Sequence, residues 1–130
     1  MMRIYPSGLI KTVLVVLLAF AALTGCSASG KTTLKYSEVV LSSNPAAPVA
    51  NESTKLIVQV DNPEYVDQEA EVQLQINSKS SLPSLIDATR EGDNYTADYI
   101  FPSAGEYTIT VHMEFEEEHY AIAKKLTVQE

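Results

Sequence analysis

The sequence contains two histidines, His112 and His119, and these are its most distinctive candidates for chemistry. Neutral imidazole is a good ligand for copper and zinc ions. Both histidines fall near the end of the chain, on either side of a run of glutamates. One hypothesis is therefore a metal-binding pair at a turn between two strands, with copper as the cofactor it would hold.

The expected hairpin geometry argues against a shared ion. A hairpin that keeps both apolar faces inward either pairs Phe115 with Tyr120 or places residues 116–119 in a four-residue loop. His119 then lies near the turn, and His112 lies about four residues away along its strand, or roughly 13 Å at ~3.3 Å per residue. Two metal–nitrogen bonds of ~2 Å each do not close that gap. We therefore expect two separate, solvent-facing histidines.

Carboxylates surround this turn and offer a second kind of site. The acidic tip consists of Glu114, Glu116, Glu117 and Glu118. It could hold a divalent cation through oxygen ligands or contact a basic partner; a solvated turn that protects the sheet edge is the simpler interpretation. The same alternatives apply to a second acidic loop formed by Asp61, Glu64, Asp67 and Glu69. A weak site in which His119 pairs with Glu114 or Glu116 also stays open.

Motifs of enzymatic chemistry are missing from the sequence. No serine occurs in G-x-S-x-G, and neither histidine has the context of a catalytic triad. No glycine-rich phosphate loop is present. Paired carboxylates are frequent in any acidic chain and carry no information about mechanism. We therefore expect a protein without enzymatic activity.

Length and charge limit the remaining possibilities. The chain has 130 residues and a formal net charge of -8, which corresponds to at most one domain with an acidic surface. Without Arg3 and Lys11, seven basic side chains remain against 17 acidic ones, for a net charge of -10. Such a surface repels phosphate backbones, so we expect no nucleic-acid partner. The single cysteine excludes a disulfide within the chain and a cysteine-based zinc site.

The first 25 residues have the features of a secretory signal peptide. A basic start with Arg3 and Lys11 precedes an apolar run over 12–23. The run ends at Leu23, and Thr24 and Gly25 follow before Cys26; this Leu-Thr-Gly-Cys sequence resembles the bacterial lipobox. The resemblance implies transfer of diacylglycerol to the Cys26 sulfur, cleavage before Cys26, and acylation of the new amine.

An uncleaved transmembrane helix is the alternative, but the run is short against the ~20 residues that span a bilayer. Two or more acyl chains hold a protein stably on a membrane. Residues 26–33 are small and polar after the cysteine, as expected for a flexible tether. We therefore expect a lipid-anchored protein on the extracytoplasmic face of the cell membrane.

Residues 34–130 read as one all-β domain. Apolar and polar residues alternate with period two between turn residues, and no segment shows a helical stripe. Two sheets with one apolar face each must stack to bury those faces. The pattern therefore predicts an immunoglobulin-like β-sandwich of about seven strands, over 35–41, 55–61, 69–77, 85–90, 95–101, 106–115 and 119–128.

Three features of these strands make sharper predictions. A glycine two residues before Tyr107, at the start of the penultimate strand, fits a tyrosine corner. The segment 85–90 has the weakest pattern, because Asp87 and Thr89 leave neither face apolar. Lys124 interrupts the apolar row of the last strand, so we expect a bulge or a strand end there.

The domain resembles the YtkA-like domain of bacterial lipoproteins, which is related to FixH-like envelope proteins. The shared features are the lipobox, the turn at 61–63, the turn at 102–107, and a last hairpin with His112-x6-His119 followed by residues 124–128. The resemblance implies an immunoglobulin-like sandwich outside the membrane, without established enzymatic activity. Some relatives are associated with copper handling and respiratory-oxidase assembly. This chain has no methionine-rich or multi-histidine segment.

Two functional hypotheses follow. The first is a membrane-anchored, non-catalytic sandwich that binds an envelope protein through a loop end or a sheet edge. The alternative is an accessory lipoprotein that handles copper, or assists oxidase assembly, through His112 and His119. The two differ in one observable, because only the second requires the histidines.

Overall fold

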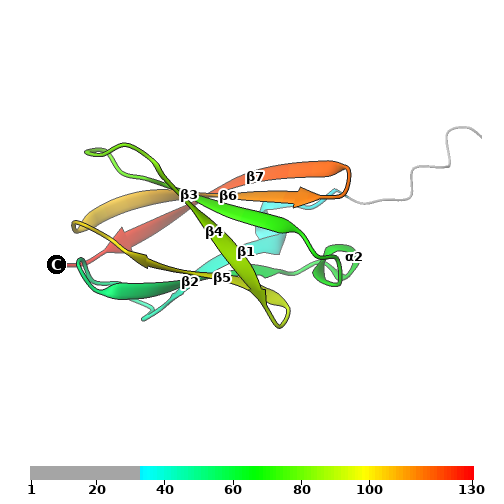
Figure 1. The fold of residues 1–130 in the computed structure, drawn as a ribbon, viewed down its shortest axis with the longest axis horizontal. Coiled ribbons are helices and arrows are strands. Elements are labelled where there is room, and N and C mark those ends of the chain that lie inside the picture. Colours follow the sequence, from blue (N-terminus) through cyan, green and yellow to red (C-terminus); the bar gives the residue numbers. More distant parts are fainter. Residues whose placement is uncertain (1–32) are drawn as a thin grey trace, which may run out of the picture. The chain divides into compact units, whose positions relative to one another are not determined.

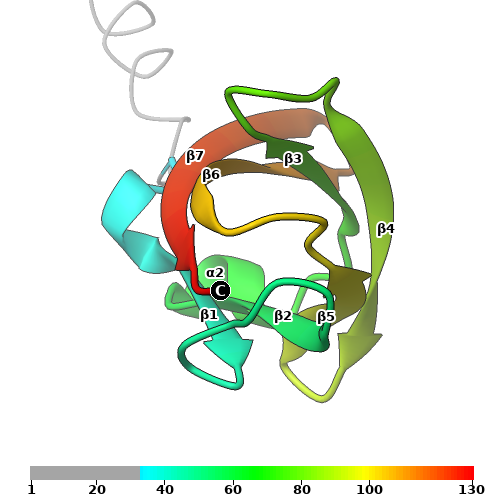
Figure 2. The same ribbon diagram turned by 90° about the vertical axis from the view of Figure 1, so that its left-hand side faces the viewer.

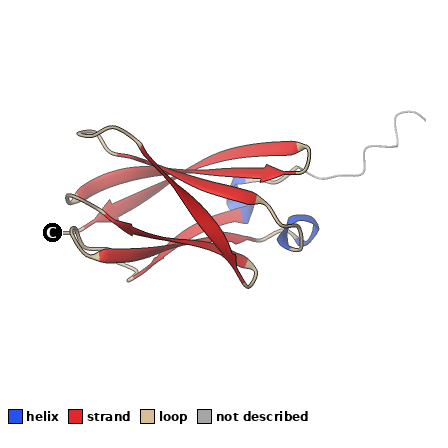
Figure 3. Cartoon of the chain, viewed as in Figure 1, coloured by secondary structure: helices blue, strands red, loops and turns tan. Residues whose placement is uncertain are grey.

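A computed structural model describes residues 33–130, which form seven antiparallel strands and two short helical segments (Figures 1 and 3). The predicted signal peptide, Cys26 and nearly all of the predicted tether lie outside the described residues. Within 33–130, no helix has the length and apolar character needed to cross a bilayer. The strands are β1 (Val39–Asn44), β2 (Ser53–Val60), β3 (Glu71–Asn77), β4 (Ser84–Glu91), β5 (Asn94–Ile100), β6 (Gly105–Phe115) and β7 (Glu118–Val128).

The strand order confirms an all-β, sandwich-like fold. Hydrogen bonds connect the strands in the order β1-β2-β5-β4-β3-β6-β7, so the two layers form one continuous, strongly curved sheet. The layers β1-β2-β5-β4 and β3-β6-β7 correspond to the two sheets of an immunoglobulin constant-type sandwich. Strand β4 joins them, because its first part pairs with β3 and its last three residues pair with β5. Figure 2 shows β4 along the side between the layers.

The core consists of the inward-facing row of each strand, as the alternation predicts. In β2, β3 and β6 every second residue is buried, and Met113 has no exposed surface. The fully or nearly buried apolar residues are Leu34, Val39, Leu56, Val58, Val60, Tyr65, Val72, Leu74, Ile76, Tyr95, Phe101, Tyr107, Ile109, Val111, Met113, Phe115, Ile122 and Val128. Burial of this apolar surface is the main contribution to stability.

Strand β4 exists as predicted, and its position explains its weak pattern. Its residues alternate between half-buried and exposed, and none is fully buried. A strand that crosses from one layer to the other covers the core only along one margin. Its end is held by Arg90, whose guanidinium lies 5.8 Å from the centre of the Tyr95 ring and donates a hydrogen bond of 2.8 Å to the Val66 carbonyl.

The tyrosine corner is confirmed. The Tyr107 hydroxyl donates a hydrogen bond of 2.7 Å to the Ser103 carbonyl, four residues upstream. Gly105 has φ of 137°, a conformation that side chains with a Cβ rarely adopt. The Tyr107 ring packs edge-on against Phe101, with ring centres 4.7 Å apart. The corner thus closes the β5–β6 turn onto the core.

Two predictions about the strands are wrong. The first strand begins at Val39, because residues Tyr36–Glu38 form a 3-10 turn, η1, in which the Glu38 carboxylate accepts a hydrogen bond of 2.9 Å from the Lys35 amide. The last strand has neither a bulge nor a break at Lys124, since its pairing with β6 is continuous. The Lys124 side chain leaves the inner face at the sheet edge, where its ammonium lies 3.5 Å from the centre of the Tyr36 ring.

The turn after β2 contains a short helix that the pattern did not predict, α2 (Pro63–Val66). The Asn62 side chain caps it by accepting a hydrogen bond of 2.9 Å from the Glu64 amide, and Pro63 supplies a helical φ at its first position. Four residues are too few to show a helical stripe. The helix buries Tyr65, which closes one end of the sandwich.

Candidate functional site

The β6–β7 hairpin has a shorter turn than the apolar pattern predicted. Phe115 pairs with Glu118, and only Glu116 and Glu117 form the turn. The predicted pairing of Phe115 with Tyr120 and the four-residue loop are both wrong. No Asn-Gly or Asp-Gly turn marks the register in this sequence, so the apolar rows were the only guide. Glu118 therefore belongs to β7 and faces the same side as Phe115.

This register brings His112 and His119 together on the outer face. Glu114 pairs with His119 and His112 pairs with Ala121, which makes the two histidines diagonal neighbours across the strands. The two ring centres lie 5.7 Å apart, with an angle of 33° between the ring planes. The expected separation of the two histidines, which excluded a shared ion, is therefore not found.

Each imidazole has a hydrogen-bond or ionic partner through one nitrogen. His112 Nε2 lies 3.0 Å from Gln75 Oε1 on β3, and an amide oxygen can only accept, so this nitrogen carries the proton. His119 Nδ1 lies 3.4 Å from Glu114 Oε1 on β6. The other nitrogens are His112 Nδ1 and His119 Nε2. Both ring orientations are thus set by neighbours on the same sheet face.

The two histidines line a groove of about 380 Å³ on the outer face of β4-β3-β6-β7. The groove floor comes from β3 and its walls from β4 and β6-β7. Its lining residues are Glu71, Val72, Gln73, Gln75, Leu85, Asp87, His112, Glu114 and His119. They include three carboxylates and neither lysine nor arginine. Gln73 donates a hydrogen bond of 3.2 Å to Asp87, which connects the β3 floor to the β4 wall.

The four glutamates of the acidic tip do not share one environment. Glu114 faces the groove, and Glu116 and Glu117 are exposed in the turn. Glu118 turns inward, where its Oε2 accepts hydrogen bonds from the Tyr65 and Tyr120 hydroxyls, the first at 2.7 Å. The second acidic loop surrounds α2, with Asp61 before it, Glu64 within it, and Asp67 and Glu69 after it.

The inward carboxylate belongs to an aromatic cluster that the sequence did not reveal. Tyr65 is 1 % exposed, and its ring packs edge-on against Phe115 and Tyr120, with centres 4.9 and 5.8 Å away. Burial raises the pKa of the Tyr65 phenol well above its usual range, and the hydrogen bonds to Tyr120 and Glu118 raise it further. This cluster connects α2 to the β6–β7 hairpin and thereby stabilises this end of the sandwich.

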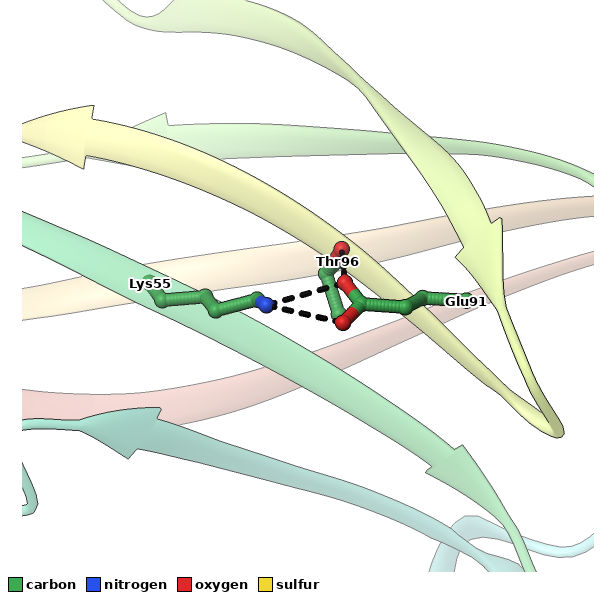
Figure 4. A network of polar contacts seen from close by, with 3 residues as sticks. All are labelled: Lys55, Glu91 and Thr96. Atoms are coloured by element: carbon green, nitrogen blue, oxygen red, sulfur yellow. Dashed lines mark hydrogen bonds and ion pairs between the residues drawn. The ribbon is translucent and has the colours of Figure 1, made fainter.

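A separate network of polar side chains lies on the outer face of the layer β1-β2-β5-β4 (Figure 4). Lys55 on β2 forms an ion pair of 2.9 Å with Glu91, which also accepts a hydrogen bond of 2.9 Å from Thr96. The hydrogen bond from Lys55 is the main cause that lowers the pKa of Glu91. These groups are exposed, and their arrangement is that of a surface ion pair.

Within 33–130, no group of three or more histidine, cysteine or acidic side chains is arranged to hold a metal ion.

Comparison with known proteins adds no assignment. No family model matches the chain, and no curated protein matches it either. The resemblance to YtkA-like domains therefore stays a prediction that rests on the motifs of this sequence. The features of this chain that bear on function are the groove and the N-terminal segment.

Proposed function

We propose that this chain is an extracytoplasmic lipoprotein, anchored through Cys26, whose sandwich is a non-catalytic binding module of the YtkA-like kind. The lipobox-like ending of an apolar N-terminal run supports the anchor. The small, polar residues that follow Cys26 would let the domain move at the membrane surface.

The contact surface in this proposal is the outer face of β4-β3-β6-β7. The observation that carries it is the groove, in which two pairs of polar side chains, Gln73–Asp87 and Gln75–His112, are hydrogen-bonded between strands. Side chains that are already hydrogen-bonded to a neighbour lose less conformational entropy on binding, which favours recognition. Leu85 adds an apolar contact at the groove wall, because 58 % of it is exposed.

The charge of the groove defines the partner. Carboxylates without basic neighbours repel anionic lipid and phosphate, and attract cationic or donor-rich groups. An envelope protein that presents lysine, arginine or amide donors would satisfy this surface. Strands β3 and β6 each hydrogen-bond to a neighbouring strand on both sides, so they have no free edge for a partner strand. The partner would therefore contact the side chains on the sheet face.

Site-specific photocrosslinking in intact cells tests the proposal. A photoreactive residue replaces Gln73 in the groove floor, and the matched control replaces Gln59, an exposed glutamine on the outer face of β2. We expect a discrete crosslinked protein at position 73 and none at 59. Equal products at both positions, or no product at 73, would contradict this contact surface.

A further inference from the structure

We infer that His112 and His119 together form a binding site for a late first-row divalent metal ion, such as Zn²⁺. The two imidazoles supply the protein ligands, and water supplies the others. This site concerns the same face as the proposed contact surface, but it stands on its own observation, the distance between the two rings.

The ring separation matches the requirement of a shared ion. Two imidazoles on one tetrahedral ion, with metal–nitrogen bonds of about 2 Å, place their ring centres on the order of 5 Å apart. The observed distance is 5.7 Å, so a small rotation of the exposed His119 side chain would bring the two rings to that spacing. His119 is 53 % exposed and has room for that rotation.

The partners of the other nitrogens prepare the rings for a metal. Histidine ligands of metals typically donate their second N–H to a carboxylate or carbonyl oxygen, which fixes the tautomer and raises ligand basicity. Here Gln75 accepts from His112 Nε2, at 3.0 Å, and Glu114 lies 3.4 Å from His119 Nδ1. The nitrogens left for the ion are His112 Nδ1 and His119 Nε2.

The groove favours a cation and selects its class. Glu71, Asp87 and Glu114 surround the histidines without a competing lysine or arginine in the lining. Imidazole ligands suit zinc, nickel and copper(II), whereas calcium and magnesium require oxygen ligands. Since only two histidines act as direct ligands and the groove is open to solvent, we expect moderate affinity and an ion with exchangeable water.

Calorimetric titration of the full-length chain in a mild detergent tests the site. The chain carries Cys26→Ala, so that its only thiol cannot bind metal. We expect one Zn²⁺ per chain, and loss of affinity by at least about tenfold in His112→Ala and in His119→Ala separately. Glu114→Gln should weaken binding about tenfold with unchanged stoichiometry. Glu106→Gln, an exposed glutamate of the same strand that pairs with Lys125, is the matched control and should bind normally.

Three results would overturn the inference. The first is no Zn²⁺ binding, or binding that survives both histidine substitutions. The second is one ion per two chains, which would place the ligands in different molecules. The third is displacement of Zn²⁺ by millimolar Ca²⁺, which would identify an oxygen site made by the carboxylates. Because the titration requires no partner protein, its failure is distinguishable from failure of the crosslinking experiment.

Discussion

Replacement of Thr54 by valine should stabilise this protein. Thr54 lies in β2 on the inner face, it is fully buried, and its hydroxyl has no hydrogen-bond partner. A buried hydroxyl without a partner destabilises the folded state by about 1–3 kcal/mol. Valine keeps the branched shape and replaces the hydroxyl by a methyl group, so Thr54→Val removes this penalty without creating a cavity.

We expect the free energy of unfolding to rise by about 1–2 kcal/mol. For a domain of this size, each 1 kcal/mol corresponds to a rise in Tm of about 4–8 °C. Urea unfolding followed by circular dichroism measures the change, with an unchanged dependence on urea as the sign that only stability has changed. Thr54→Ser is the matched control: it keeps the hydroxyl, loses the methyl group, and should destabilise the fold by about 1 kcal/mol.

A Thr54→Val variant with unchanged or lower stability would refute this reasoning. It would mean that the hydroxyl has a partner in solution, such as a buried water molecule, and that the inner face of β2 is not a purely apolar environment at this position.

Three further predictions concern other parts of the chain. Tyr65→Phe should lower the free energy of unfolding at pH 7 by about 1.5–3 kcal/mol, because the hydroxyl donates to the Glu118 carboxylate. Burial raises the Tyr65 pKa from its usual value of 10.0, so the phenol contributes fully to stability below pH 10, and this contribution is lost as the pH rises further. Urea unfolding from pH 7 to pH 11 should therefore show a smaller fall in the free energy of unfolding for Tyr65→Phe than for the unsubstituted protein. Tyr107→Phe should lower the free energy of unfolding by about 0.5–1.5 kcal/mol in the same assay, because the hydrogen bond to the Ser103 carbonyl is lost. An unchanged urea midpoint would show that this hydrogen bond adds no stability. Cys26→Ala should abolish metabolic labelling with palmitate and leave an uncleaved precursor on gels, whereas normal processing would exclude the lipobox interpretation.

Much of the fold could be predicted from local patterns. Period-two alternation is a direct consequence of strand geometry, so the inward rows of β2, β3 and β6 follow from the order of residue types. The tyrosine corner was also predictable, because its glycine and tyrosine lie close together in the sequence. By contrast, α2 escaped prediction because four residues held by an asparagine cap carry no periodic signal.

The candidate site could be predicted only in part. The metal-binding chemistry of histidine pointed to these two residues in the sequence. The distance between them, however, depends on the register of the hairpin, because a shift in strand pairing changes which residues are diagonal neighbours. The apolar rows pointed to Phe115 opposite Tyr120, yet Phe115 pairs with Glu118. The reason is tertiary, since the Glu118 carboxylate is satisfied by two tyrosine hydroxyls and can therefore occupy an inward position.

The sequence by itself determined the all-β class, most of the strand positions and the core rows, because each depends on residues close together along the chain. Only the tertiary structure decided the crossing of β4 between layers, the inward turn of Glu118 and the approach of His112 to His119. These features arise from contacts between strands and from the pairing of buried polar groups with distant partners. The energy of such contacts depends on three-dimensional packing, which no local pattern of residue types encodes.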